Sequence, residues 1–205
     1  MKKVSDIHAI KIIFFITACY VGLWAIRIPT IKDQLQTDYL GVGYIMLSFA
    51  IGSIVAMIFA NALILKTSTK SILTYTLIAE GCLWLPVPFI QELWIFMLFS
   101  FIFGMSYGAF EIACNVYASN LEVREKKSMM SGFHAFWSLG VLFGSLITSF
   151  LLEWNYSFIF NILLYVIILL PLSMYFVFCL ESQVEEQSED SSKKNIFFIW
   201  PLLIL

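Results

Sequence analysis

Two polar side chains that could do chemistry lie inside the long apolar stretch 98–122. They are one carboxyl group, Glu111, and one carboxamide, Asn115. On a helix they share one face with Gly104 and Gly108, because the four positions follow one another at spacings of four, three and four. A carboxyl group within a lipid-spanning helix costs several kcal/mol and usually marks a functional site. We therefore interpret Glu111 as a proton carrier or solute ligand; the alternative is a protonated acid that only hydrogen-bonds a neighbouring helix.

The next apolar stretch, 128–152, supplies polar side chains that could lie opposite Glu111. His134 is its only titratable group before the end, and it shares a helical face with Ser131, Ser138, Ser145 and Thr148. A polar face on an apolar helix is expected to point into a helix bundle. We interpret Asn115, His134 and Ser138 as candidate solute-binding residues. For Asn115 and His134 the alternative is structural hydrogen bonding between helices.

Three further residues have chemistry of their own. Trp137 could stack on a ring-shaped solute, although a packed or lipid-facing indole is the commoner role. Glu80 is the only charged residue of stretch 71–90 and lies roughly 14 Å from either end, so it is a second candidate for proton handling, with a structural role as the alternative. Arg27 lies near the end of the first apolar stretch and is interpreted as an anchor or outer gate whose side chain snorkels to the interface.

The composition places these residues in a membrane protein. The chain is 60% hydrophobic and 13% charged, against about 45–50% and about 25% in soluble domains. A net charge of −2 provides no basic surface, so nucleic acid is not an expected partner. The four cysteines lie in apolar runs without metal-ligand spacing, and soluble-enzyme motifs are absent from the sequence. We expect no catalytic residues, no metal and no cofactor.

Six apolar runs are long enough to cross a bilayer, which takes about 20 residues. They are 10–35, 39–65, 71–90, 93–122, 128–152 and 156–180. The predicted fold is an all-α integral membrane bundle of six helices over residues 1–180, followed by a charged cytoplasmic linker at 181–195. Residues 196–205 are predicted to be the truncated start of a seventh helix, since ten residues cover only about 15 Å. The alternatives are a fragment of a longer chain or a last segment that does not span.

The distribution of cations predicts the orientation. With a cytoplasmic N-terminus, two cations fall outside, Arg27 and Lys32, and ten fall inside: Lys2, Lys3, Lys11, Lys66, Lys70, Arg124, Lys126, Lys127, Lys193 and Lys194. Cytoplasmic loops carry an excess of Lys and Arg, so we expect a multi-pass protein of the cell (inner or plasma) membrane with its N-terminus and linker in the cytoplasm.

The order of elements resembles the N-terminal half of a twelve-helix transporter of the major facilitator superfamily. The run FEIACNVYASNLE followed by SGFHAFWSLGVLFGSL resembles the fucose:proton symporter branch and its uncharacterised bacterial relatives. In that branch an acid followed four residues later by Asn marks the fourth helix, which matches Glu111 and Asn115, and the acid couples transport to protons. The sugar-contacting polar position of the fifth helix falls on His134.

The chain departs from that branch at two places. The fucose symporters have a second acid and neighbouring Asn residues in the first helix, where this chain has Val21, Gly22, Trp24 and Ala25. The resemblance therefore does not extend to fucose itself. The superfamily loop between helices two and three is altered to NALILKTSTK, with Asn61 for its first Gly and Leu65 for its Asp.

These observations predict a secondary active transporter. The expected activity is proton-coupled import of a small polar solute such as a sugar, driven by the proton gradient, in contact with the lipid bilayer. The missing C-terminal half or a second copy would complete the transport site. The alternatives are a non-transporting membrane remnant or scaffold from a truncated gene, and a half-transporter that acts as a parallel dimer.

Overall fold

The computed structural model describes residues 5–181, except for the side chains at 60–62 and 65. The predicted seventh helix at 196–205, and all of the predicted linker after its first residue, lie outside the described residues. The described residues form six long helices and one short 3-10 helix: α1 (Asp6–Gln34), α2 (Tyr39–Lys66), α3 (Thr69–Trp84), η1 (Val87–Phe89), α4 (Leu93–Glu125), α5 (Met130–Glu153) and α6 (Phe158–Cys179).

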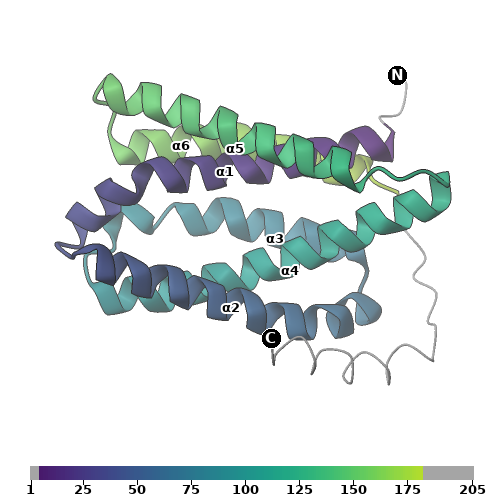
Figure 1. Ribbon diagram of the computed structural model, residues 1–205, viewed down its shortest axis with the longest axis horizontal. Coiled ribbons are helices and arrows are strands. Elements are labelled where there is room, and N and C mark those ends of the chain that lie inside the picture. Colours follow the sequence, from purple (N-terminus) through teal and green to yellow (C-terminus); the bar gives the residue numbers. More distant parts are fainter. Residues whose placement is uncertain (1–4, 182–205) are drawn as a thin grey trace.

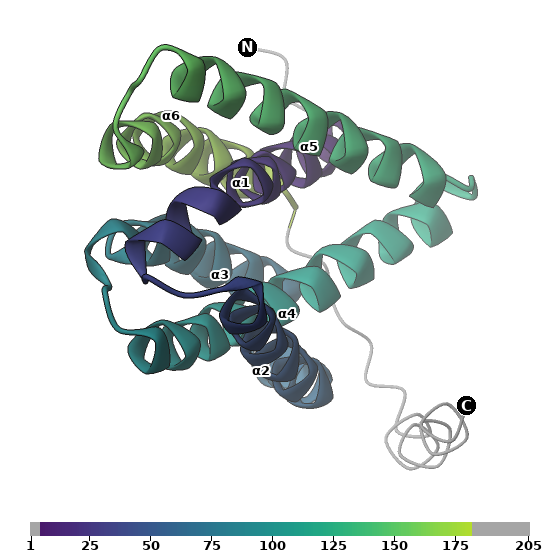
Figure 2. The same cartoon turned by 60° about the vertical axis from the view of Figure 1, so that its left-hand side comes forward.

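The six helices pack in two groups of three (Figures 1 and 2). One group holds α1, α5 and α6, and the other holds α2, α3 and α4. Within the groups, α1 packs along α5 and α2 packs along α4, while α3 also contacts α6 and so joins the groups. The start of α1, the end of α6 and the α2–α3 and α4–α5 turns lie at one end of the bundle, which we name the N-terminal end (Figure 1).

Glycines allow the two most extensive helix contacts. A Cβ at Gly104 of α4 would lie 2.0 Å from the backbone oxygen of Phe49 in α2, and one at Gly140 of α5 would lie 2.2 Å from the backbone oxygen of Phe15 in α1. Only glycine permits such an approach of two helix backbones. Gly108, on the same face of α4, also meets α2, at the backbone of Ser53.

Side-chain caps define where several helices begin. Asp38, Ser68 and Ser157 precede α2, α3 and α6, and each accepts a hydrogen bond from the backbone N–H three residues on, at 2.9, 3.1 and 3.1 Å. These bonds satisfy N–H groups that a helix start leaves without partners. The Glu122 carboxylate does the same at the α4–α5 turn, where it accepts from the backbone N–H groups of Met129 and Met130.

The third span differs from its prediction as one continuous helix over 71–90. Helix α3 ends at Trp84, and the chain reaches η1 through Pro86. Proline has no N–H to continue the helical hydrogen bonds, and its ring clashes with the carbonyl four residues earlier, which explains the break. Taken together, Thr69–Phe89 is still long and apolar enough to cross a membrane.

Charged side chains join three helices at the N-terminal end. Arg124 Nη2 lies 3.0 Å from Asp6 Oδ2, and Arg124 Nη1 lies 3.5 Å from Glu181 Oε2. The backbone N–H of Glu181 donates to Asp6 Oδ1 at 3.3 Å. Asp6 is buried in this cluster. Its contacts connect the start of α1 with the end of α4 and the residues after α6.

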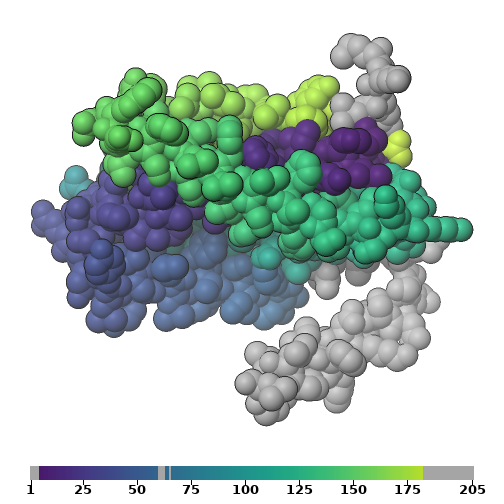
Figure 3. All heavy atoms as spheres, turned by 45° about the horizontal axis from the view of Figure 1, so that its top comes forward, coloured from purple at the N-terminus to yellow at the C-terminus, as the bar shows by residue number. Residues whose placement is uncertain are grey.

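The outward faces of the helices are apolar. Figure 3 shows one face of the molecule, on which α5 (green) lies over α1 (purple). Large hydrophobic side chains are exposed on α2 to α6 and in the turns between them, among them Tyr75, Trp94, Leu139, Phe150, Trp154, Ile167 and Phe178. All six spans are long and apolar enough to cross a bilayer. Apolar surface on this scale suits contact with lipid rather than water. The chain is a multi-pass all-α membrane protein, which confirms the predicted fold class.

Candidate functional site

The predicted site residues gather around a cavity of about 170 Å³ between α1, α4 and α5, which we name the polar cavity. It is lined by Phe14, Tyr107, Phe110, Glu111, Cys114, Asn115, His134 and Trp137. Four of these were expected to act together from the sequence: Glu111, Asn115, His134 and Trp137. The capped turn between α4 and α5 brings them together, because it places the first turns of α5 beside the inward face of α4.

An acid and an imidazole share the polar cavity. Glu111 is half-buried, and the His134 ring is the neighbouring group that acts on it electrostatically. The His134 ring packs edge-on against Phe14, with 5.7 Å between ring centroids. Both side chains can take up or release a proton, so the polar cavity holds two groups that can carry one.

The amide oxygen of Asn115 is buried and has no hydrogen-bond partner among the described residues. A buried acceptor left without a donor costs about 1–3 kcal/mol. Because Asn115 lines the polar cavity, a donor that enters the cavity, such as a water or a solute hydroxyl, would satisfy it. Within the site, this unpartnered oxygen is the observation that most directly favours a polar ligand.

Ser138 lies outside the lining of the polar cavity. It is exposed, and its hydroxyl donates to the backbone oxygen of His134 at 3.1 Å. The polar positions that follow it on α5 serve contacts between helices: Ser145 donates to Gly22 of α1 at 3.5 Å, and Thr148 lies 2.9 Å from the hydroxyl of Tyr165 in α6. The polar face of α5 is thus divided between the cavity and helix packing.

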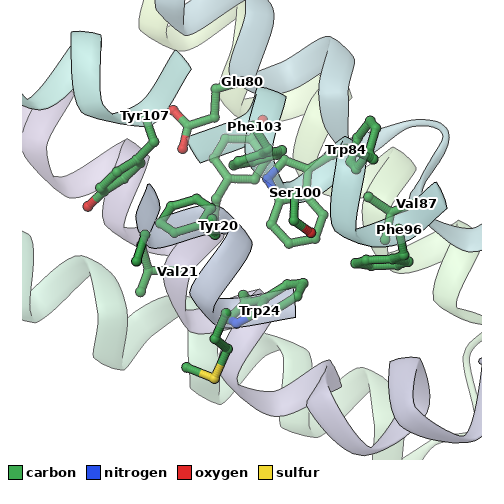
Figure 4. Close-up of a pocket in the computed structure, with 14 residues that line it drawn as sticks. Tyr20, Val21, Trp24, Glu80, Trp84, Val87, Phe96, Ser100, Phe103 and Tyr107 are labelled. Carbon is green, nitrogen blue, oxygen red and sulfur yellow. The ribbon is translucent and has the colours of Figure 1, made fainter. Parts of the chain in front are cut away.

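A second cavity of about 370 Å³, the aromatic cavity, lies between α1, α2, α3 and α4 (Figure 4). It is lined by Tyr20, Val21, Trp24, Met46, Phe49, Ala50, Glu80, Trp84, Val87, Phe96, Phe99, Ser100, Phe103 and Tyr107. Glu80, the second predicted proton-handling residue, is buried and points into this cavity. The two predicted acids therefore belong to different cavities.

Tyr107 lines both cavities and was missed by sequence reasoning. It lies on α4 one helical turn before Glu111, and its hydroxyl interacts with the indole of Trp137. The spacing of four residues from Glu111 is the signal that could have found it.

Arg27 does not snorkel to the interface, which corrects the sequence-based interpretation. Its side chain is 2% exposed. Its Nε donates to Asn161 Oδ1 at 3.0 Å, its Nη2 donates to the backbone oxygen of Tyr156 at 3.3 Å, and its guanidinium lies over the Phe158 ring at 5.4 Å. These acceptors come from the start of α6, 129 and 134 residues away, so no local pattern around Arg27 indicates them.

A bundle of six membrane-spanning helices that encloses a polar cavity with an acid, an amide and an imidazole is the architecture of a membrane protein that handles solutes or protons. The comparison with known families makes this specific. The chain belongs to the Major Facilitator Superfamily, whose family model matches residues 12–204. The resemblance noted from the sequence is thereby confirmed at the level of the superfamily.

Two curated relatives are similar to part of the chain. An uncharacterised MFS-type transporter of Yersinia pestis is 28% identical over 145 residues, which cover 69% of this chain and 37% of the relative. An uncharacterised transporter of Sinorhizobium fredii is 27% identical over 141 residues, which cover 64% of this chain and 35% of the relative. The match thus spans little more than a third of these relatives. No solved structure matches the chain.

Proposed function

We propose that the chain is the N-terminal half of a secondary transporter that couples import of a small polar solute, such as a sugar, to the proton gradient. Membership of the superfamily and the names of both relatives support transport. The unpartnered Asn115 oxygen in the polar cavity is the single observation that carries the choice of a polar solute. A second six-helix unit, from a longer chain or another copy, would complete the transport site.

In this proposal Glu111 carries the proton. It is a half-buried carboxyl group inside the polar cavity, and crossing the membrane region is far less costly for a neutral acid than for a carboxylate. His134 acts as the neighbour that receives or supplies the proton, and Glu80 is the second candidate for proton handling. Protonation from one side of the membrane and release to the other would accompany the rocking of two six-helix units.

Asn115 is assigned to the solute. Its amide oxygen would accept a hydrogen bond from a solute hydroxyl, and the Trp137 indole would pack against an apolar face of a sugar ring. His134 can donate or accept in addition. Ser138 supports the backbone of His134 through its hydrogen bond and stays away from the solute. The positive-inside rule favours a cytoplasmic N-terminus in the cell membrane.

Uptake into vesicles tests the proposal. The chain, together with whatever second unit completes it, is reconstituted and supplied with a panel of radiolabelled sugars under an imposed proton gradient. We expect Glu111→Gln to lose gradient-driven accumulation by at least about tenfold while solute exchange without a gradient persists. Glu153→Gln, an exposed acid at the end of α5, is the matched control and should accumulate solute normally. Full accumulation by Glu111→Gln would exclude the coupling role.

A further inference from the structure

The aromatic cavity has a chemistry different from that of the polar cavity. Eight of its 14 lining residues are aromatic. The rings form a continuous wall: Tyr20 stacks on Trp84 with 6.0 Å between centroids, Trp84 meets Phe103 edge-on at 5.6 Å, and Trp24 lies 6.3 Å from Trp84. Aromatic rings carry a negative quadrupole on their faces, so a cavity lined mainly by rings can attract a cation.

Glu80 is the acidic residue in the described lining of the aromatic cavity. Glu80 is 6% exposed, and its carboxyl group points toward Tyr20 and Tyr107 (Figure 4). Among the described residues, the lining contains no Lys, Arg or His. A buried carboxylate is stable only when it is paired with a cation or protonated. The Glu80 carboxyl group is therefore protonated while the cavity is empty of cations, and it can ionise when a cation enters.

A second polar group in the same wall also lacks a partner. The indole Nε1–H of Trp84 is buried and makes no hydrogen bond among the described residues. Because Trp84 follows Glu80 by one helical turn, the donor and the acid lie on the same side of α3. A ligand that satisfies both must carry a positive charge and, about one helical turn away, a hydrogen-bond acceptor.

We propose that the aromatic cavity binds an organic monocation, a substituted ammonium with an apolar or aromatic body and one hydroxyl group. Glu80 is its counter-ion, the rings of Tyr20 and Trp84 contact the cationic head, and the Trp84 N–H donates to the hydroxyl. Aromatic rings arranged around a quaternary ammonium are a recurring mode of cation binding. The cavity volume of about 370 Å³ falls in the range of small-molecule sites, about 300–1,000 Å³.

Neutral sugars fit this cavity poorly. A sugar presents several hydroxyl groups that each need a partner once buried, whereas most of the lining is hydrocarbon or ring surface. The site is therefore distinct from the polar cavity and does not depend on Glu111 as a proton carrier. Among the described lining residues, Tyr107 is the one that the two cavities share.

Calorimetry on the whole chain in lipid nanodiscs, with empty nanodiscs subtracted, tests the proposal. The probes are (3-hydroxyphenyl)trimethylammonium and its neutral isostere 3-tert-butylphenol. We expect the wild-type protein to bind the cation at least about tenfold more tightly than the isostere. Glu80→Gln should remove that preference and leave binding of the isostere within about threefold. Trp84→Phe should weaken binding of the cation severalfold, because the N–H is lost and the ring is kept.

Two matched variants distinguish a cation site at Glu80 from binding in the polar cavity or at the protein surface. Glu92→Gln, an exposed acid at the start of α4, should bind both probes as the wild type does, and so should Glu111→Gln. Equal affinity of the wild type for both probes would overturn the proposal even if Glu80→Gln failed to fold, since the cavity would then be an apolar or lipid-filled space. Loss of cation binding in Glu111→Gln would place the ligand in the polar cavity and overturn it as well.

Discussion

Replacing Asn161 with Leu is expected to destabilise the bundle by about 1–2 kcal/mol. The side chain is fully buried, and its Oδ1 accepts from Nε of Arg27 at 3.0 Å. A hydrogen bond to a charged group contributes about 1.5–3 kcal/mol, and a buried guanidinium left short of an acceptor adds to the loss. Two factors limit the effect. Arg27 keeps the backbone oxygen of Tyr156 and the Phe158 ring, and Leu removes the Asn161 Nδ2 group, which is buried without a partner among the described residues. Titration with dodecyl sulfate in mixed micelles, followed by tryptophan fluorescence, measures the free energy of unfolding.

A double-mutant cycle tests the cause. Arg27→Met removes the buried charge, so Asn161→Leu should cost much less in that background, with a coupling energy of at least about 1.5 kcal/mol. Ser149→Ala on the exposed face of α5 is the control and should change stability by less than about 0.5 kcal/mol. A cost below about 0.5 kcal/mol for Asn161→Leu, without coupling, would mean that Arg27 reaches the interface as its sequence position suggests.

Two further predictions concern packing. Gly140→Leu should lower stability by at least about 3 kcal/mol or prevent folding, because the new Cβ would meet the backbone of α1 at 2.2 Å and no rotamer relieves that contact. Gly43→Leu is the control, since a Cβ there meets nothing within 4 Å. This variant should elute in size-exclusion chromatography as the wild type does. Tyr165→Phe should cost about 1–3 kcal/mol in the same detergent titration, because its hydroxyl donates to the backbone oxygen of Gly144 at 2.6 Å and lies 2.9 Å from the hydroxyl of Thr148. A neutral Tyr165→Phe would show that water replaces these bonds.

The six spans were predictable because hydrophobic length is a local property of the sequence. The ends of the spans were less predictable. The break near the end of the third span follows from Pro86, which is visible in the sequence but is ignored when spans are assigned from hydropathy alone. Which helix packs on which is not local. The glycines at 104 and 108 indicated a close neighbour on α4, but only the three-dimensional arrangement identifies it as α2.

Within the candidate site, helical spacing placed Glu111 and Asn115 on one face, and the polar face of α5 brought in His134. Residues that act across distant segments were not predictable. Arg27 looked like an interfacial anchor because its acceptors come from the start of α6. The aromatic cavity was missed for the same reason, since its rings come from four helices and each is an ordinary apolar residue in its own helix.

The hydrogen bond between Asp6 and Glu181 has a consequence for how the chain is assembled during synthesis. The two residues are 175 positions apart, and at about 5–20 residues per second the ribosome needs roughly 10–35 s to make the intervening chain. For that time the carboxyl group at the start of α1 lacks its final backbone partner. Closure of this end of the bundle must therefore be a late event in biogenesis. A nascent chain arrested before residue 181 would lack the hydrogen bond from the Glu181 N–H to Asp6 at the start of α1.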